Sequence, residues 1–348
     1  MNRVRRAIEQ NYGGRKKAMP NYWMISDRTV LTDGFGLERG LLTYWTSDKT
    51  PLDNFANWNQ ASAADFKNLL IAAADQFPAL PHGENEDQKH VTFLVHGYNN
   101  GWKDAAGLYE QVCRSLFSGT NGLGLCISFD WPSFGNVLGY YPDRAHAREC
   151  AIDLTEVLSE LYDWLVAKQQ ATVKNPADAC KAKVSLIAHS MGNYVMQKAM
   201  AAAWTRKNQP LLVTLINQLV MVAADVDNDL FETSSVDSGD GAALANLCYR
   251  ITALYSGRDA VLGASAGLKH FGTRRLGRSG LAVRPPAMFD NVWDVDCSSF
   301  FPKTVDGFQI HSAYFSNRQT LRLMREILRG VDRTVLATMG LTEGNAWP

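Results

Sequence analysis

One stretch of the sequence, residues 183–195, constrains the fold more than any other. It opens with a short apolar and β-branched run, residues 184–188, which is typical of a buried strand. A helical pattern begins at Asn193, so only four residues, 189–192, are left for the connection between them. Ser190 therefore falls on a sharp turn from strand to helix, which exposes its hydroxyl at the sheet edge beside the free N–H groups of the new helix. This pattern predicts a nucleophile elbow with Ala188 in place of the first glycine of G-x-S-x-G. The alternative is an ordinary strand–helix junction with a serine cap.

Strand-like and helix-like patterns alternate through most of the chain. Strands are expected over 22–31, 40–45, 91–95, 125–129, 184–188, 219–223, 250–255 and 292–295, and helices over 62–77, 102–117, 143–168, 193–205 and 313–329. The first two strands are expected to pair antiparallel at one edge. Alternation of strands with helices of about ten or more residues predicts an α/β fold: a mostly parallel central sheet of about eight strands with helices on both faces.

No internal repeat, low-complexity segment or linker divides the sequence. We therefore expect residues 1–348 to form a single domain. Within it, residues 1–90 are expected to form an N-terminal arm and edge strands, and residues 130–170 are a candidate cap or lid region. A composition of 46% hydrophobic residues is sufficient for one large core.

Charge, targeting signals and cysteines argue against several classes of protein. Equal numbers of basic and acidic residues, 35 of each, give no reason to expect nucleic acid or an anionic membrane as a partner. The basic start of the chain is not followed by an apolar segment, and no apolar run reaches the length of a membrane span. A cytoplasmic location without stable membrane insertion, and six free thiols, are therefore expected. The absence of C-x-x-C and H-E-x-x-H motifs predicts no metal site.

Polar residues follow the expected strands where a ligand would bind. In an open α/β sheet, ligands lie at the carboxyl ends of the strands. At these ends the sequence places His96-Gly97-Tyr98, Ser190, Asp225, Asp259 and, beyond the last strand, His311. The order of serine, then acid, then histidine is one of the orders in which a catalytic triad occurs along a chain.

These motifs together resemble the α/β-hydrolase superfamily. The resemblance is carried by His96-Gly97, by Ala188-His-Ser-Met-Gly192, by Gly257-Arg-Asp259 and by His311, and it covers about residues 90–330. The run Phe129-Asp-Trp-Pro-Ser133 and the pair Asp225-Val-Asp227 are similar to a poorly characterised bacterial esterase/lipase-like branch. The resemblance implies an α/β-hydrolase fold. It also implies a serine esterase that cleaves small-molecule carboxylic esters through an acyl-enzyme, without a cofactor.

Each candidate residue has a role in that chemistry. Ser190 is expected to be the nucleophile, His311 the general base, and Asp259 the acid that fixes the imidazole tautomer. Asp225 is the alternative acid, because it follows the preceding strand, and His270 is a rival base in a basic segment. The backbone N–H groups of two further residues are expected to form the oxyanion hole; these residues are Tyr98 and Met191. His96 and His189 are expected to have structural roles.

An aromatic loop leaves the strand that precedes the elbow. Its four aromatic residues are expected to overhang the site and to line an acyl or alcohol pocket; they are Trp131, Phe134, Tyr140 and Tyr141. The alternative is a hydrophobic cluster that only supports the fold.

Other functions remain open at this point. A thioesterase, amidase, peptidase or acyltransferase would use the same residues, and a catalytically silent scaffold would use the fold for binding alone. A nucleotide-binding α/β protein is disfavoured because no glycine-rich phosphate loop follows any expected strand.

Overall fold

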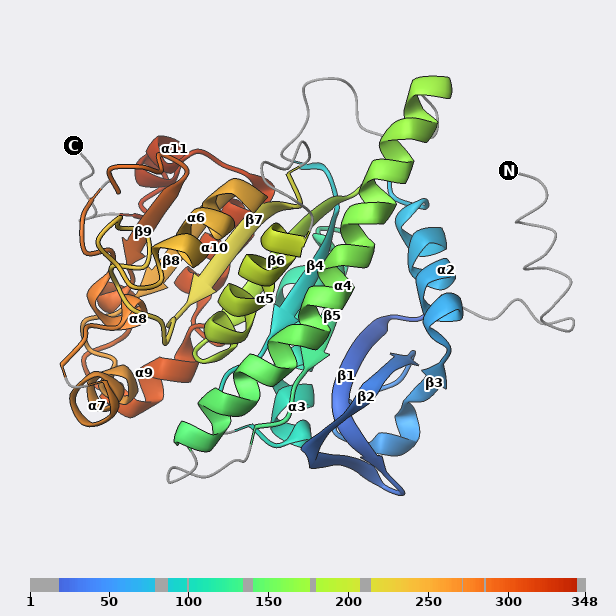
Figure 1. Ribbon diagram of the computed structural model, residues 1–348, viewed down its shortest axis with the longest axis horizontal. Helices are drawn as coiled ribbons and strands as arrows, with labels where there is room; N and C mark the ends of the chain where they lie inside the picture. Colours follow the sequence, from blue (N-terminus) through green and yellow to red (C-terminus); the bar gives the residue numbers. More distant parts are fainter. Residues whose placement is uncertain are drawn as a thin grey trace, which may run out of the picture.

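A nine-stranded sheet forms the centre of the described part of the chain (Figure 1). The computed structural model describes residues 19–78, 87–98, 100–133, 140–175, 180–206, 214–270, 272–284 and 286–342, with side chains omitted at 140–143, 169, 205–206 and 268–269. The strands are β1 (Tyr22–Leu31), β2 (Gly34–Ser47), β3 (Asn59–Ala61), β4 (His90–Val95), β5 (Gly124–Asp130), β6 (Lys183–His189), β7 (Ile216–Val222), β8 (Cys248–Tyr255) and β9 (Val292–Asp296). Their order across the sheet is β3-β2-β1-β5-β4-β6-β7-β8-β9.

The predicted α/β architecture is confirmed. Strands β4 to β9 are parallel, and β1 joins them through a parallel pairing with β5. β1 and β2 pair antiparallel as expected, and β2 in turn pairs with β3. The short β3 is the strand that the sequence pattern did not predict, and it forms the edge of the sheet.

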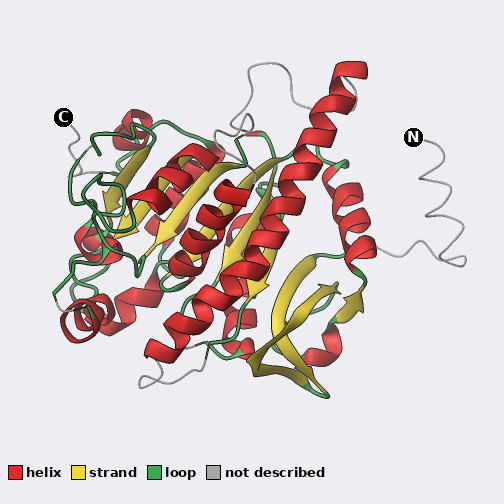
Figure 2. Cartoon of the chain, in the orientation of Figure 1, coloured by secondary structure: helices red, strands yellow, loops and turns green. Residues whose placement is uncertain are grey.

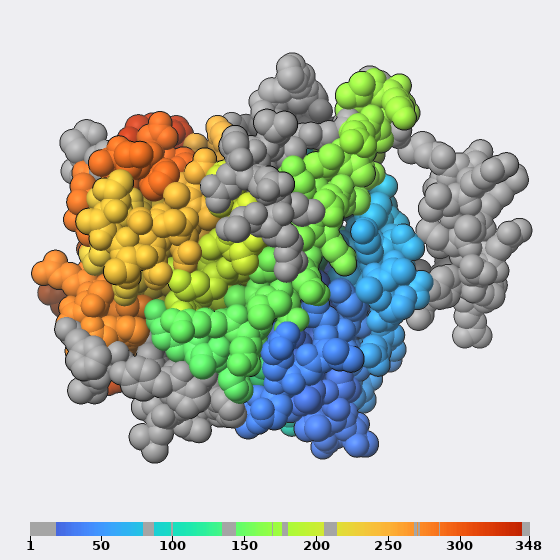
Figure 3. Space-filling model, viewed as in Figure 1, coloured from blue at the N-terminus to red at the C-terminus, as the bar shows by residue number. Residues whose placement is uncertain are grey.

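Helices cover both faces of the sheet (Figure 2). On one face lie α2 (Ala63–Ala74), α4 (Tyr140–Lys174), α5 (Gly192–Arg206) and α6 (Ser238–Leu247), and on the other lie α3 (Trp102–Val112), α10 (Arg318–Arg329) and α11 (Arg333–Thr338). Three short helices follow the carboxyl ends of β8 and β9: α7 (Ala260–Ala264), α8 (Leu276–Ser279) and α9 (Gly307–Ala313). Figure 3 shows α4, α5 and α6 packed side by side over the first face.

The core consists of two layers separated by the sheet. Successive residues of a strand point to opposite faces, so Phe93 and Val95 contribute to the layer under α4 and α5. Leu94, between them, contributes to the layer under α3 and α10. Because both layers exclude water, the central strands are buried at nearly every position and most of their side chains are apolar.

The long helix α4 contains most of the candidate cap region. Leu154 and Leu158 on this helix are fully buried against the sheet, so the described part of residues 140–170 is a covering helix of the fold. Residues 134–139 lie outside the described part, and a lid function there stays a prediction. Among the helices of the described ranges, none combines the length and the apolar composition needed to cross a bilayer.

Helix ends explain one success and one error of the sequence pattern. Ser62 caps α2 by accepting a hydrogen bond from the Asp65 N–H, as expected. The closing helix predicted over 313–329 begins too early, because α10 starts only at Arg318 and Ala313 is the last residue of α9. The side chain of Asn317 caps α10 by accepting hydrogen bonds from two backbone N–H groups, so a new helix begins after it. His311 consequently lies on the separate short helix α9.

Candidate active site

The backbone at Ser190 has the conformation of a strained turn. Ser190 lies between β6 and α5 and has a φ of +50°, in the left-handed region that L-residues other than glycine rarely adopt. Hydrogen bonds hold this turn: the Ser190 N–H donates to the carbonyl of Val222 (3.0 Å), and the Ser190 carbonyl accepts from the Asp225 N–H (3.1 Å). The Asn193 side chain also donates to the Ser190 carbonyl (3.1 Å). The surrounding structure therefore compensates for the strain.

Two glycines allow close approach around the serine. A Cβ atom at Gly192 would lie 2.3 Å from the carbonyl oxygen of His96, so no larger residue fits where α5 meets the end of β4. A Cβ atom at Gly97 would lie 2.7 Å from the Cβ of Ser190. The turn after β4 and the turn after β6 are therefore in direct contact, and the glycines are required for that contact.

The structure brings three of the predicted residues into one hydrogen-bonded line. Nε2 of His311 lies 2.8 Å from the Ser190 hydroxyl, and Nδ1 of His311 lies 2.8 Å from Oδ2 of Asp259. These residues come from the end of β6, the end of β8 and the helix α9, which meet at the carboxyl edge of the sheet (Figure 1). Asp259 is fully buried, whereas the side chain of His311 retains 13% of its exposure. The histidine is thus the member of the line that faces solvent.

The line has a defined proton arrangement. A carboxylate only accepts hydrogen bonds, so Nδ1 of His311 carries the proton donated to Asp259, and the neutral ring accepts from Ser190 through Nε2. The second oxygen of Asp259 accepts from the backbone N–H of Leu262 (2.9 Å), because Asp259 is also the N-cap of α7. Both carboxylate oxygens are therefore held, and the carboxylate cannot turn away from the imidazole.

The alternative acid and the rival base lie elsewhere. Asp225 accepts hydrogen bonds from the guanidinium of Arg275 (2.8 Å) and from the hydroxyl of Ser265 (2.9 Å). Since Arg275 is itself fully buried, this ion pair joins the end of β7 to the segment before α8. His311, and not His270, hydrogen-bonds to Ser190.

The turn that carries Tyr98 is held by a buried ion pair. Arg28 of β1 donates to Asp130 (2.9 Å) and to the carbonyl of Asn100 (3.0 Å), and the His96 ring donates to the carbonyl of Gly97 (2.9 Å). Burial acts to raise the pKa of Asp130, but Arg28 and His96 beside it hold that pKa below its ordinary value. The turn that follows β4 is therefore rigidly placed beside Ser190. An oxyanion role for the N–H groups of Tyr98 and Met191 stays a prediction.

Arg28 and Asp130 were not identified as supporting residues from the sequence. A charged residue is rarely buried unless it is paired. The position of Arg28 within the strand pattern of β1 was therefore the one indication in the sequence that it has a buried acidic partner. Its partner could not be named, because β1 and β5 are about a hundred residues apart in the chain and only the sheet order brings them together.

The aromatic residues of the expected pocket are only partly described. Trp131 is fully buried, its ring stacks on His96 with the centroids 5.5 Å apart, and its Nε1–H donates to the His96 carbonyl (2.8 Å). Trp131 therefore stabilises the turn after β4 through its contacts with His96. Phe134 and the side chains of Tyr140 and Tyr141 lie outside the described residues.

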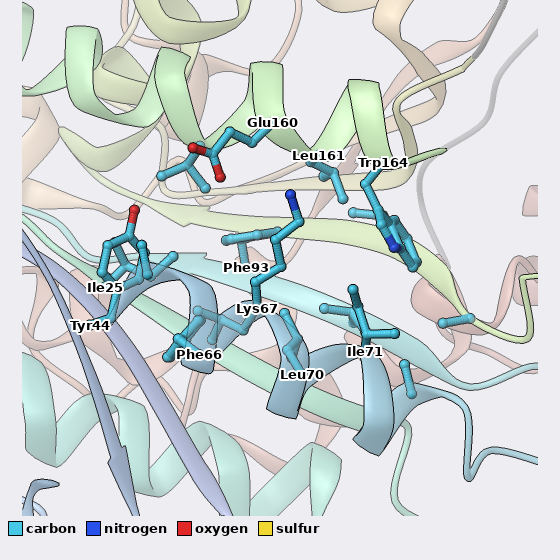
Figure 4. A pocket seen from close by; sticks show the side chains of 17 residues that line it. Ile25, Tyr44, Phe66, Lys67, Leu70, Ile71, Phe93, Glu160, Leu161 and Trp164 are labelled. Carbon is cyan, nitrogen blue, oxygen red and sulfur yellow. The ribbon is translucent and has the colours of Figure 1, made fainter. Parts of the chain in front are cut away.

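An apolar pocket lies at a distance from the triad. It is lined by residues of α2, α4 and the sheet, including Phe66, Leu70 and Phe93, and the side chains of Lys67 and Glu160 point toward it (Figure 4). Two of its lining residues, Val91 and Val184, are near the starts of β4 and β6, whereas Ser190 follows the end of β6. This pocket therefore opens beside the amino-terminal half of the strands and does not contain the triad.

The cysteines and the other metal-binding side chains form no cluster that would add a metal to the site in the described ranges. Among the described residues, no cluster of three or more histidine, cysteine, aspartate or glutamate side chains is arranged to hold a metal ion. The six cysteines, all within the described ranges, are free thiols, and five of them are buried.

Comparison with known proteins identifies the family. A family model described as "Alpha/beta hydrolase of unknown function (DUF900)" matches residues 79–324. A search of curated proteins found no match.

Two solved esterases and one predicted hydrolase are similar to this chain at low identity. An esterase from Pyrobaculum calidifontis shares 11% identity over 70% of this chain and 76% of its own, with a TM-score of 0.37. Carboxyl esterase 2 from the fungus Tuber melanosporum shares 11% identity over 95% and 99%, with a TM-score of 0.39. A predicted hydrolase from Thermoplasma acidophilum shares 14% identity over 72% and 90%, with a TM-score of 0.32. These similarities are too weak to indicate an activity.

Proposed function

Because the chain belongs to a family of alpha/beta hydrolases of unknown function, we propose that it is a serine hydrolase that cleaves carboxylic esters of small molecules. The observation that carries this proposal is the continuous line from the Ser190 hydroxyl through His311 to the buried Asp259, with both hydrogen bonds at 2.8 Å. A serine on a strained turn, a base within reach of it and an acid behind the base are the three parts of nucleophilic acyl transfer.

The proposed reaction has two halves. In the first, the Ser190 oxygen attacks the ester carbonyl while Nε2 of His311 takes its proton; the imidazolium then gives that proton to the leaving alcohol, and an acyl-serine remains. In the second, His311 takes a proton from water, the hydroxide attacks the acyl-serine, and the proton returns to Ser190 as the carboxylic acid leaves. Every proton that is taken up is returned, so no cofactor is required by the balance of the reaction.

Two features of the site favour the charged states along this path. Asp259 is fully buried and fixed by the Leu262 N–H, so its negative charge faces the imidazolium without reorienting. The N–H groups of Tyr98 and Met191 are the proposed donors to the oxyanion, and removal of one such donor costs about 10²–10³ in rate in a serine protease.

The test compares Ser190, which directly follows β6, with Ser185 near the start of that strand. Ser190→Ala is expected to lower the hydrolysis of a fluorogenic short-chain ester by about 10⁴-fold or more, because the nucleophile is lost. Ser185→Ala is the matched control: Ser185 is also buried and also hydrogen-bonded to a histidine, but it lies at the other end of β6. Its variant is expected to retain activity within tenfold of the wild type.

Two results would contradict the proposal. Activity of a folded Ser190→Ala variant within tenfold of the wild type would exclude Ser190 as the nucleophile. A wild-type protein that neither hydrolyses esters nor reacts with a fluorophosphonate would instead support a binding scaffold that has lost catalysis.

A further inference from the structure

His189 precedes the nucleophile in the chain and contacts the base. It is the last residue of β6, directly before Ser190, and its Nε2–H donates to the backbone carbonyl of His311 (2.8 Å). Its ring lies 5.0 Å from the His311 ring and 5.4 Å from the Phe315 ring, centroid to centroid. The side chain is buried, so it contacts the base from the protein interior.

The carbonyl that accepts this hydrogen bond has no partner within α9, because the helix is short. The last four carbonyl groups of a helix have no partner within the helix, and α9 ends at Ala313, only two residues after His311. His189 supplies a donor to one of these carbonyls. The strand that carries the nucleophile and the helix that carries the base are therefore joined directly, through a group that takes no part in proton transfer.

We propose that His189 is a positioning residue for the reaction. Its Nε2–H holds the main chain of His311 against β6, so that the His311 ring stays within hydrogen-bonding distance of the Ser190 hydroxyl. This inference rests on the proposed function, because it concerns the geometry of the same serine and the same base. A hydrogen bond at the backbone restricts the position of the ring without competing for either of its nitrogens.

The protonation state of His189 is compatible with this role. Burial and the neighbouring His311 lower the pKa of His189 to about 3, so its ring is neutral when His311 becomes a cation during the reaction. With Nε2 as the donor, Nδ1 carries a lone pair, and Nδ1 has no hydrogen-bond partner among the described residues. Nδ1 lies 2.9 Å from where a Cβ of residue 97 would be, so Gly97 leaves the room that the ring occupies.

The experiment separates the hydrogen bond from the bulk of the ring. Glutamine places an amide N–H at about the reach of the histidine Nε2, whereas phenylalanine keeps the ring and lacks the donor. His189→Phe is expected to lower kcat about 10- to 100-fold and the rate of fluorophosphonate labelling by the same factor, with KM within threefold, because a base displaced by about 1 Å acts poorly. His189→Gln is expected to retain at least about a third of the wild-type kcat.

His90→Phe is the matched control. His90 is another buried histidine with a pKa lowered to about 3, but it begins β4 at the opposite end of the sheet. Its variant is expected to lower the melting temperature and to leave kcat per folded molecule within threefold of the wild type. Should His189→Phe fail to fold, His189→Leu is a second variant without the donor.

The outcomes distinguish this inference from the proposed function. If the wild type is active and the donor-free His189 variant has a kcat within threefold of it, the positioning role is wrong. The role is also wrong if His189→Gln loses as much activity as the donor-free variant. If the wild type itself shows neither hydrolysis nor labelling, the failure belongs to the proposed function.

Discussion

Two serine–histidine pairs lie near opposite ends of β6, and their environments differ. At the carboxyl end of β6, Ser190 hydrogen-bonds to Nε2 of His311 at 2.8 Å; nearer its start, Ser185 hydrogen-bonds to Nδ1 of His90 at 2.7 Å. The two distances are nearly equal. The far nitrogen of His311 contacts Asp259, whereas the far nitrogen of His90 has no hydrogen-bond partner among the described residues.

The pairs also differ in backbone and in access to solvent. Ser185 lies in the regular parallel pairing of β6 with β4 and β7, and both it and His90 are fully buried. Ser190 has a positive φ, and His311 is partly exposed. The comparison shows that a hydrogen-bonded serine and histidine are not sufficient for a site. The acid behind the ring, the strained turn and the access of solvent are what distinguish the pair that we propose as catalytic.

Replacement of the acid, Asp259, is expected to cause the largest loss of activity, because it removes the main difference between the two pairs. In Asp259→Asn the amide no longer requires a proton on Nδ1 of His311, so the ring can adopt the wrong tautomer, as His90 is free to do. The corresponding change in a serine protease lowers kcat by about 10⁴-fold, and a loss of similar size is expected here in kcat for ester hydrolysis.

Asp225→Asn is the matched control for the acid. Asp225 also follows a strand, but it pairs with the buried Arg275, so its replacement is expected to lower stability by about 3 kcal/mol and to change kcat per folded molecule much less. The reverse result, with the larger loss of kcat in Asp225→Asn, would show that the acid was assigned to the wrong strand end.

The pair of Ser185 and His90 should contribute to the pH dependence of the free energy of unfolding. Burial and the charges of Lys183 and Lys89 lower the pKa of His90 to about 3, against about 6.5 in an unfolded chain. Below pH 6.5 the unfolded state therefore binds a proton that the folded state does not. The free energy of unfolding should fall as the pH drops toward 3, by about 1.4 kcal/mol per pH unit for this one histidine.

Urea unfolding at pH 6.5 and pH 5 would measure this contribution. His90→Gln should reduce the difference between the two pH values by about 1.6 kcal/mol, and the pH dependence contributed by His189 should remain. An unchanged difference in the variant would mean that His90 is protonated in the folded protein, contrary to its buried environment.

The sequence predicted the parts of the site that depend on local pattern. The elbow followed from an apolar run that meets a helical pattern at Ser190, and the parallel sheet followed from the alternation of strands and helices. The candidates Asp259 and His311 followed from their places after the last strands. The parallel sheet is confirmed, and the structure brings Asp259 and His311 within hydrogen-bonding reach of one another beside Ser190, while their catalytic roles stay predictions. Each inference depends on a few adjacent residues and on one general property of parallel sheets.

The parts that depend on contacts between distant segments could not be predicted. Both Asp225 and Asp259 follow strands, and the choice between them depended on where α9 places His311. Trp131 was expected to overhang the site, but its aromatic character does not give its direction, and in the structure the side chain is fully buried with its ring against His96. The anchoring of the β4 turn by Arg28 required the knowledge that β1 lies beside β5.

Covalent labelling tests the central claim most directly. A fluorophosphonate reacts with a serine only when a neighbouring base activates it, so it distinguishes the two serine–histidine pairs in one measurement. We expect one adduct per protein molecule, located by peptide mass spectrometry on Ser190, with Ser185 unmodified and with no adduct in His311→Ala. An adduct on any other residue, or an active enzyme whose Ser190 stays unmodified, would contradict the account.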